Sequence, residues 1–179
     1  PAPFRHGGDA WLVSNGNTTR DATHLLRWSQ KDCSAHAYPV PEQVIWTVVA
    51  ADDAFYTTNT VNGAAHVVRR GMDGEVEAEA TFDWTVLSSL TLADGRLYAA
   101  GTTGDPGREE SVLLTLDPTN VTEIARVSLG PAGLPLSTAA RDGQLYLPTA
   151  TASSAGGTDE HEVSTVPVVD LATNTVHSV

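Results

Sequence analysis

Two acidic stretches are the parts of this chain whose residue types are best suited to chemistry. The first contains Asp105, Glu109 and Glu110, and the second is the run Asp159, Glu160, His161 and Glu162. Clustered carboxylates suit a hard cation such as calcium. They equally suit a solvated acidic surface, because the sequence has neither EF-hand spacing nor a calcium-binding nonapeptide repeat. Both stretches are therefore predicted to belong to a binding surface. No cofactor is expected, and calcium is the one that such carboxylates would accept.

Two histidines begin similar apolar runs that lie 42 residues apart. The runs are His24-Leu25-Leu26-Arg27 and His66-Val67-Val68-Arg69. Histidines at matching places in a repeat can converge on a metal or act as acid and base. The later counterparts are valines, Val112 and Val166, so at most two histidines would converge. A metal site at His24 and His66 is one hypothesis, and shared ancestry of the repeats is the other.

Several classes of function are disfavoured by composition and by missing motifs. The net charge is −12, from 22 acidic against 10 basic residues, which repels nucleic-acid phosphates and anionic lipid. No run of 18 apolar residues is present, so no membrane insertion is expected. The sequence also contains no nucleophile elbow, no zinc-protease helix motif, no P-loop and no dinucleotide-binding glycine motif.

The elements that position these residues come from an internal repeat. A small or acidic turn followed by an aromatic-bearing strand occurs four times, at spacings of 44, 42 and 48 residues. The four copies begin Gly8-Asp9-Ala10-Trp11-Leu12, Asp52-Asp53-Ala54-Phe55-Tyr56, Asp94-Gly95-Arg96-Leu97-Tyr98 and Asp142-Gly143-Gln144-Leu145-Tyr146. An apolar run precedes most copies, and two further strand-like runs follow each one. The unit is therefore four short antiparallel strands, here called A to D, in about 45 residues.

Four strands in a repeat of this length predict an all-β fold, a β-propeller with four visible blades of four antiparallel strands. We expect a single domain over residues 1–179, with blades at about 1–43, 44–85, 86–130 and 131–179. A β-sandwich with a coincidental hairpin spacing is the alternative fold.

The Asp-Gly-x-Leu-Tyr strand, followed by an apolar strand ending in Asp-Pro or Asp-Leu, resembles the degenerate repeats of bacterial β-propellers. The quinoprotein-like, gluconolactonase-like and surface-layer propellers share this style. The resemblance implies the architecture and leaves the function open, because this fold hosts many activities. The signatures of WD repeats and the tryptophan docking motifs of quinoproteins are absent.

The first repeat bears on whether the ring is whole. Only seven residues precede Gly8, and two of them are prolines, which cannot donate to a sheet ladder. This favours part of a larger propeller, whose further blades come from the same or another chain. The alternative is a closed four-bladed ring in which Ala2–Arg5 forms a minimal strand.

The repeat also predicts a core and a binding face. Two sets of apolar residues should be buried between blades, namely Leu12, Phe55, Leu97 and Leu145, and Leu26, Val68, Leu114 and Val168. The loops between strands B and C should be long and should open together on one face, at residues 14–23, 57–65, 101–110 and 148–162. Long loops on a rigid scaffold commonly carry binding sites.

Two functions remain open at this point. The first is an extracytoplasmic, non-enzymatic binding or scaffold module that holds a protein or glycan on the long-loop face. The second is a metal-dependent propeller enzyme of the lactonase or lyase kind. The chain shows no signal-peptide core at its amino terminus.

Overall fold

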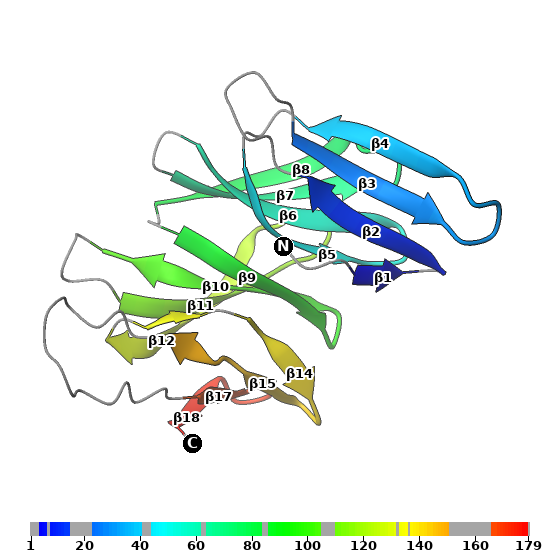
Figure 1. The fold of residues 1–179 in the computed structure, drawn as a ribbon. Helices are drawn as coiled ribbons and strands as arrows, with labels where there is room; N and C mark the ends of the chain where they lie inside the picture. Colours follow the sequence, from blue (N-terminus) through cyan, green and yellow to red (C-terminus); the bar gives the residue numbers. More distant parts are fainter. Residues whose placement is uncertain are drawn as a thin grey trace, which may run out of the picture.

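A computed structural model shows four antiparallel sheets of four strands each, arranged as successive blades (Figure 1). It describes residues 4–6, 8–14, 23–40, 44–61, 64–83, 86–104, 110–131, 133–135, 137–150 and 166–178. Within these ranges no helix is long and apolar enough to cross a membrane. The expected all-β architecture of four four-stranded blades is confirmed.

Each blade is built from strands that pair in chain order. Blade 1 contains β1 (Phe4–His6), β2 (Asp9–Ser14), β3 (Thr23–Ser29) and β4 (Ala35–Val40). Blade 2 contains β5 (Ile45–Ala50), β6 (Ala54–Val61), β7 (Ala64–Gly71) and β8 (Val76–Phe82). Blade 3 contains β9 (Val86–Ala93), β10 (Arg96–Thr103), β11 (Glu110–Leu116) and β12 (Glu123–Pro131). Blade 4 contains β14 (Ala139–Arg141), β15 (Gln144–Tyr146), β17 (Pro167–Asp170) and β18 (Thr175–Ser178). A separate ribbon pairs β13 (Leu134–Pro135) with β16 (Thr149–Ala150).

The tight turns between strands A and B form because their residues accept a left-handed backbone. Asp94 and Gly95 have φ angles of 48° and 69°, and Asp142 and Gly143 have 51° and 72°. Two successive positive φ angles are the geometry of the hairpin turn that Asp-Gly favours. The turns between strands C and D use aspartate side chains instead. Asp117 Oδ1 accepts the amide of Thr119 at 2.7 Å, and Asp170 Oδ1 accepts that of Thr173 at 2.9 Å.

Three apolar cores join consecutive blades. Blades 1 and 2 meet around Trp11, Val13, Leu25, Val40, Ile45 and Phe55. Blades 2 and 3 share the largest cluster, which includes Tyr56, Val67, Leu87, Leu97, Leu114 and Leu116. Blades 3 and 4 meet around Tyr98, Ala100, Leu113, Leu145, Leu147 and Val169. The blades therefore stack in chain order, with blade 1 at one end of the stack and blade 4 at the other (Figure 1).

The predicted core is confirmed in blades 2 and 3 and at Leu145 of blade 4. Phe55, Leu97, Leu114 and Leu145 are fully buried, and Val68 is 2% exposed. Val168 is 5% exposed, but it pairs with Tyr146, and its neighbour Val169 is the residue in the core shared with blade 3. The prediction for Leu12 is wrong, because 40% of this residue is exposed, and Leu26 is only half-buried. Both lie on the side of blade 1 that faces away from blade 2. No described residue of another blade covers this side.

Two details of the strand boundaries differ from the expectations. The innermost strand of blade 1 is present as β1, three residues from Phe4 to His6 paired with β2, close to the stub considered at Ala2–Arg5. The second B–C loop, expected to be long, is short, because β6 continues to Val61 and β7 begins at Ala64. Thr57, Thr58, Thr60 and Val61 are β-branched and favour strand, which extends the hairpin beyond its predicted end.

Gly101 is a position where the fold requires a glycine. It lies at a bulge of β10 against β9, and a Cβ there would sit 2.2 Å from the carbonyl oxygen of Val86. We expect Gly101→Ala to lower the free energy of unfolding by about 1–3 kcal/mol, the usual cost of overpacking a core. Gly71→Ala is the matched control in β7, because its Cβ would meet only the flexible ends of Asp73 and Glu77. Urea denaturation of both variants measures the difference, and equal losses would contradict the tight packing at Gly101.

Candidate functional site

The end of the blades where strand B leads into strand C is the candidate binding end. In blade 2 the structure describes residues 44–61 and 64–83, so most of this end can be followed. The first residue of β5, Ile45, pairs with Asn59 near the end of β6. Three large apolar side chains are exposed there: Val44 at 38%, Trp46 at 48% and Val61 at 40%. Ile45, between the first two, is fully buried, so β5 anchors in the core while its neighbours face solvent. The apolar run 44–50 predicted the strand, but it did not show which of its residues would be exposed.

The acidic residues predicted for this end lie mostly outside the described residues. Asp105, Glu109, Asp159, Glu160, His161 and Glu162 belong to that group. Glu110, the first residue of β11, is described and exposed, and its carboxylate accepts a hydrogen bond from the hydroxyl of Ser128 in β12. Glu110 thus begins strand C of blade 3 rather than ending the loop before it, and a joint site with the other six residues stays a prediction.

The two histidines occupy equivalent positions, as the repeat predicted. His24 lies opposite Ser14 in blade 1, and His66 lies opposite Asn59 in blade 2. Each is on strand C, the third strand of its blade, and not on the innermost strand. His66 Nδ1 is 2.6 Å from Glu79 Oε1 and 3.3 Å from the hydroxyl of Thr81. His66 thus has polar partners within its own blade, and a metal role for it and His24 stays a prediction.

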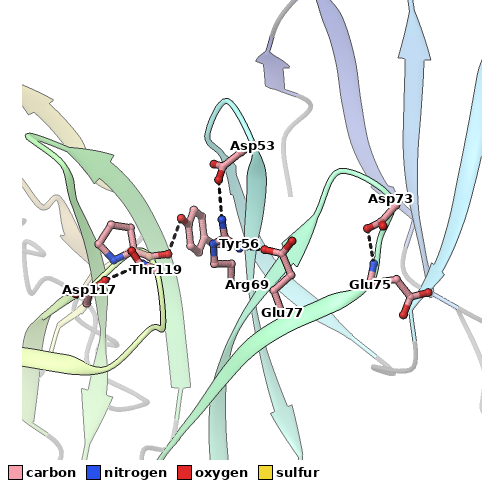
Figure 2. Close-up of polar contacts among 9 residues, drawn as sticks. Asp53, Tyr56, Arg69, Asp73, Glu75, Glu77, Asp117 and Thr119 are labelled. Carbon is pink, nitrogen blue, oxygen red and sulfur yellow. Dashed lines mark hydrogen bonds and ion pairs between the residues drawn. The ribbon is translucent and has the colours of Figure 1, made fainter.

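The opposite end of the blades has a small hollow between blades 2 and 3, of about 210 Å³. Figure 2 shows Arg69 at this hollow, with Asp53 on one side and Glu77 on the other. Arg69 Nη2 donates to Asp53 Oδ2 at 2.8 Å, and Arg69 Nη1 pairs with Glu77 Oε2. Because two carboxylates neutralise the guanidinium, this hollow is a poor anion site, and its polar groups serve to tie strands together.

A tyrosine in the same region links one blade to the next. Tyr56 of β6 donates a 2.8 Å hydrogen bond from its hydroxyl to the carbonyl oxygen of Pro118, in the C–D turn of blade 3 (Figure 2). Tyr98 of blade 3 occupies the equivalent place and is buried in the core shared with blade 4, where burial raises the pKa of its phenol. The repeated tyrosines therefore act as structural residues between blades.

The arrangement of the described His, Cys, Asp and Glu side chains bears on a metal site. Over the ranges that the structure describes, no three His, Cys, Asp or Glu side chains lie close enough to hold one metal ion. The single cysteine, Cys33, is exposed in the C–D turn of blade 1. The described surface offers a ligand two places. One is the set of exposed apolar residues at the loop end, and the other is a groove of about 420 Å³ on blade 1, lined mainly by apolar residues that include Leu12, Leu26 and Trp28.

Comparison with known proteins gives the class of fold. No protein-family model matches this sequence, and no curated protein matches it either. Solved structures do match. The β-propeller domain of the Trilobed protease from Pyrococcus furiosus superposes with a TM-score of 0.65 at 6% identity, over 100% of this chain and 56% of that one.

Two further propellers are similar over nearly the whole chain. BamB from Moraxella catarrhalis matches with a TM-score of 0.55 at 10% identity, over 95% of this chain and 48% of that one. The WD40 domain of Pan2 from Neurospora crassa matches with a TM-score of 0.53 at 8% identity, over 96% of this chain and 62% of that one.

These similarities, together with the stacked four-stranded blades, place the chain in the β-propeller class. It spans about half to three fifths of the propellers it matches. At these identities the likeness establishes the fold alone, so the function has to be argued from the surface of this chain.

Proposed function

We propose that this chain is a non-enzymatic binding module that holds a protein partner at the end where the B–C loops open. The observation that carries the proposal is the exposure of Val44, Trp46 and Val61 at that end of blade 2. Exposed apolar side chains gathered on a rigid scaffold are typical of protein-binding surfaces, and tryptophan is among the residues that contribute most to such interfaces.

The scaffold beneath these residues supports the proposal. β5 and β6 are held by fully buried neighbours, Ile45 and Phe55, in the core between blades 1 and 2. Thr58 of β6 also donates a buried 3.1 Å hydrogen bond to the carbonyl oxygen of Leu87 in β9. A surface fixed in this way loses little conformational entropy when a partner binds. The acidic residues predicted at the same end favour a partner with a basic surface around an apolar centre.

Trp46→Ala is expected to weaken capture of the partner roughly 10–30-fold, the effect of losing an interface hot spot. Reversing the charges of Asp159, Glu160 and Glu162 to lysine should weaken capture as well, and more at low than at high salt. The measurement is affinity capture from the extracellular fraction of the producing cells, followed by titration of the captured protein. Ile124→Ala, which removes an equally exposed residue from β12, is the control and should bind normally.

Unchanged affinity of the folded Trp46→Ala and charge-reversed variants would show that this end is not the binding site. Binding to a glycan array without any captured protein would identify a glycan partner instead. Elemental analysis tests the enzyme alternative, because stoichiometric calcium, magnesium or zinc that is lost in His66→Ala or in a loop carboxylate variant would favour a metal-dependent activity.

A further inference from the structure

The face of blade 2 that packs on blade 1 contains two buried side-chain oxygen atoms without a hydrogen-bond partner. Thr57 and Asn59 follow Phe55 at every second position of β6, so all three side chains lie on the face toward blade 1. Thr57 is completely buried and Asn59 is 2% exposed. Thr57 Oγ1 and Asn59 Oδ1 nevertheless form no hydrogen bond with any residue that the structure describes. Such atoms cost free energy, because folding removes them from water without replacing their hydrogen bonds.

The other blades have no polar side chain at the place of Thr57. The strand pairing gives Ala99 of blade 3 and Leu147 of blade 4 as its equivalents, and both are fully buried in the contact with the preceding blade. Asn59 corresponds to Gly101 in blade 3, which has no side chain to satisfy. The unpaired oxygens are therefore a feature of the contact between blades 1 and 2 and not of the repeat.

Polar groups at the other two contacts form hydrogen bonds from one blade to the next. Thr58 is next to Thr57 in β6, but it faces blade 3 and finds a partner there. Two further bonds of this kind involve Tyr56, which Figure 2 shows, and a pair of hydroxyls between blades 3 and 4. The three bonds join Thr58 to the carbonyl oxygen of Leu87 at 3.1 Å, Tyr56 to that of Pro118 at 2.8 Å, and Ser89 to Thr138 at 2.9 Å.

The strands of blades 1 and 2 also approach each other less closely than those of the other consecutive blades. β9 of blade 3 lies along β5 and β6 of blade 2, and β13 and β14 approach β9 from the other side. Among the described residues, no strand of blade 1 lies along a strand of blade 2 in this way. The contact depends instead on long side chains, and the largest are Trp11 and Phe55, whose ring centroids are 5.7 Å apart.

These differences change what it costs to separate two blades. Separating blade 1 from blade 2 uncovers an apolar core, but it also returns Thr57 and Asn59 to water, where both form hydrogen bonds again. Separating blade 2 from blade 3 uncovers a larger core and breaks the bonds of Tyr56 and Thr58 as well. Local openings of a protein follow the contacts that are cheapest to break.

We propose that the contact between blades 1 and 2 is the joint at which this stack of blades opens. Blade 1 moves away as a unit, while blades 2 to 4 stay together. The buried, unpaired oxygens of Thr57 and Asn59 raise the population of the open state. The inference concerns contacts inside the chain and does not depend on the proposed function.

Native-state hydrogen exchange, followed residue by residue by nuclear magnetic resonance, tests the proposal. The amides of β2, β3 and β4 should exchange through one shared opening, about tenfold or more as often as those of β10 and β11. They should also exchange more often than the amides of β15 and β17. Blade 4, like blade 1, has one described neighbour, so this comparison separates the joint from the effect of lying at one side of the stack.

Two matched substitutions test the role of the unpaired oxygens. Thr57→Val keeps the shape of the side chain and removes the unpaired hydroxyl, so it should slow the exchange of β2 to β4 about 3–10-fold. Thr58→Val is the control, because it removes a hydroxyl that is bonded to Leu87, and it should speed exchange in β9 without slowing that of blade 1. Asn59→Leu is a second variant at the joint and should act in the same direction as Thr57→Val.

Three results would overturn the proposal. The first is exchange of β2 to β4 only through unfolding of the whole chain, and the second is more frequent opening of blade 4 than of blade 1. The third is faster exchange of blade 1 in both Thr57→Val and Asn59→Leu, which would mean that these side chains hold the two blades together.

Discussion

Trp11→Ala is expected to lower the free energy of unfolding by about 3–5 kcal/mol, the usual cost of truncating a buried tryptophan. Trp11 is 1% exposed and lies at the centre of the core between blades 1 and 2. Its ring centroid is 6.1 Å from that of Tyr38 and 5.7 Å from that of Phe55, and the guanidinium of Arg27 lies 5.6 Å from it. Alanine would leave all three groups facing a cavity.

The loss should be local, because each blade is stabilised mainly by its neighbours. Hydrogen exchange of the Trp11→Ala protein should show lower protection in β2, β3 and β4, with β9 to β12 protected as before. Trp46→Ala is the matched comparison, since 48% of that residue is exposed, and it should lower the free energy of unfolding by clearly less than Trp11→Ala does. Equal effects of the two substitutions would contradict the core assigned between blades 1 and 2.

Leu97→Ala is expected to destabilise the protein by roughly 2–4 kcal/mol, as for other fully buried leucines. Leu97 is completely buried in the largest of the three cores, between blades 2 and 3. It pairs with Leu92 on one side and Leu116 on the other, so its removal affects three strands of blade 3 at once.

The control for Leu97 is Ile124→Ala on β12, where 48% of the residue is exposed and much less burial is lost than at Leu97. Guanidinium denaturation of both variants gives the comparison. A loss below about 0.5 kcal/mol for Leu97→Ala would mean that the strand register derived from the repeat is wrong.

The repeated hairpins explain why the fold was predictable from the sequence. Asp94-Gly95 and Asp142-Gly143 favour the positive φ angles that a two-residue hairpin requires, and they adopt them in the structure. The shared place of Leu97 and Leu145 in the repeat then predicted that both are buried, and both are fully buried. The strand around Leu97 is buried on both faces, which the repeat did not show. At these places the backbone preference of the turn residues and the spacing of the repeat predict the same hairpins. The fold could therefore be predicted from this one sequence.

Blade 1 shows where sequence reasoning failed. Matching Ala10 with Ala54 aligned Trp11 with Phe55, whereas the strand pairing places Trp11 with Tyr56. Leu12 was predicted to be buried because it shares a place in the repeat with Phe55, Leu97 and Leu145. Its exposure depends on whether a neighbouring blade is present, and a pattern within one strand does not contain that information.

The candidate site was predicted less completely than the fold. The repeat placed His24 and His66 at matching positions of strand C, where the structure has them, and it placed Glu110 in the loop before strand C, whereas Glu110 is the first residue of β11. It did not identify Val44, Trp46 and Val61, because an apolar run predicts burial for all of its members. Their exposure results from the bulge of β5 next to Trp46 and from the continuation of β6 to Val61.

The most direct test of the central claim, that four blades stack in chain order, is a set of nuclear Overhauser contacts between side chains of consecutive blades. We predict contacts from the Trp11 indole to the Phe55 ring, whose centroids are 5.7 Å apart, and from the Tyr98 ring to the Leu145 methyl groups in their shared core. Absence of both contacts, or contacts from Trp11 to Leu145 within one chain as a two-layer sandwich would give, would contradict the stacked-blade fold.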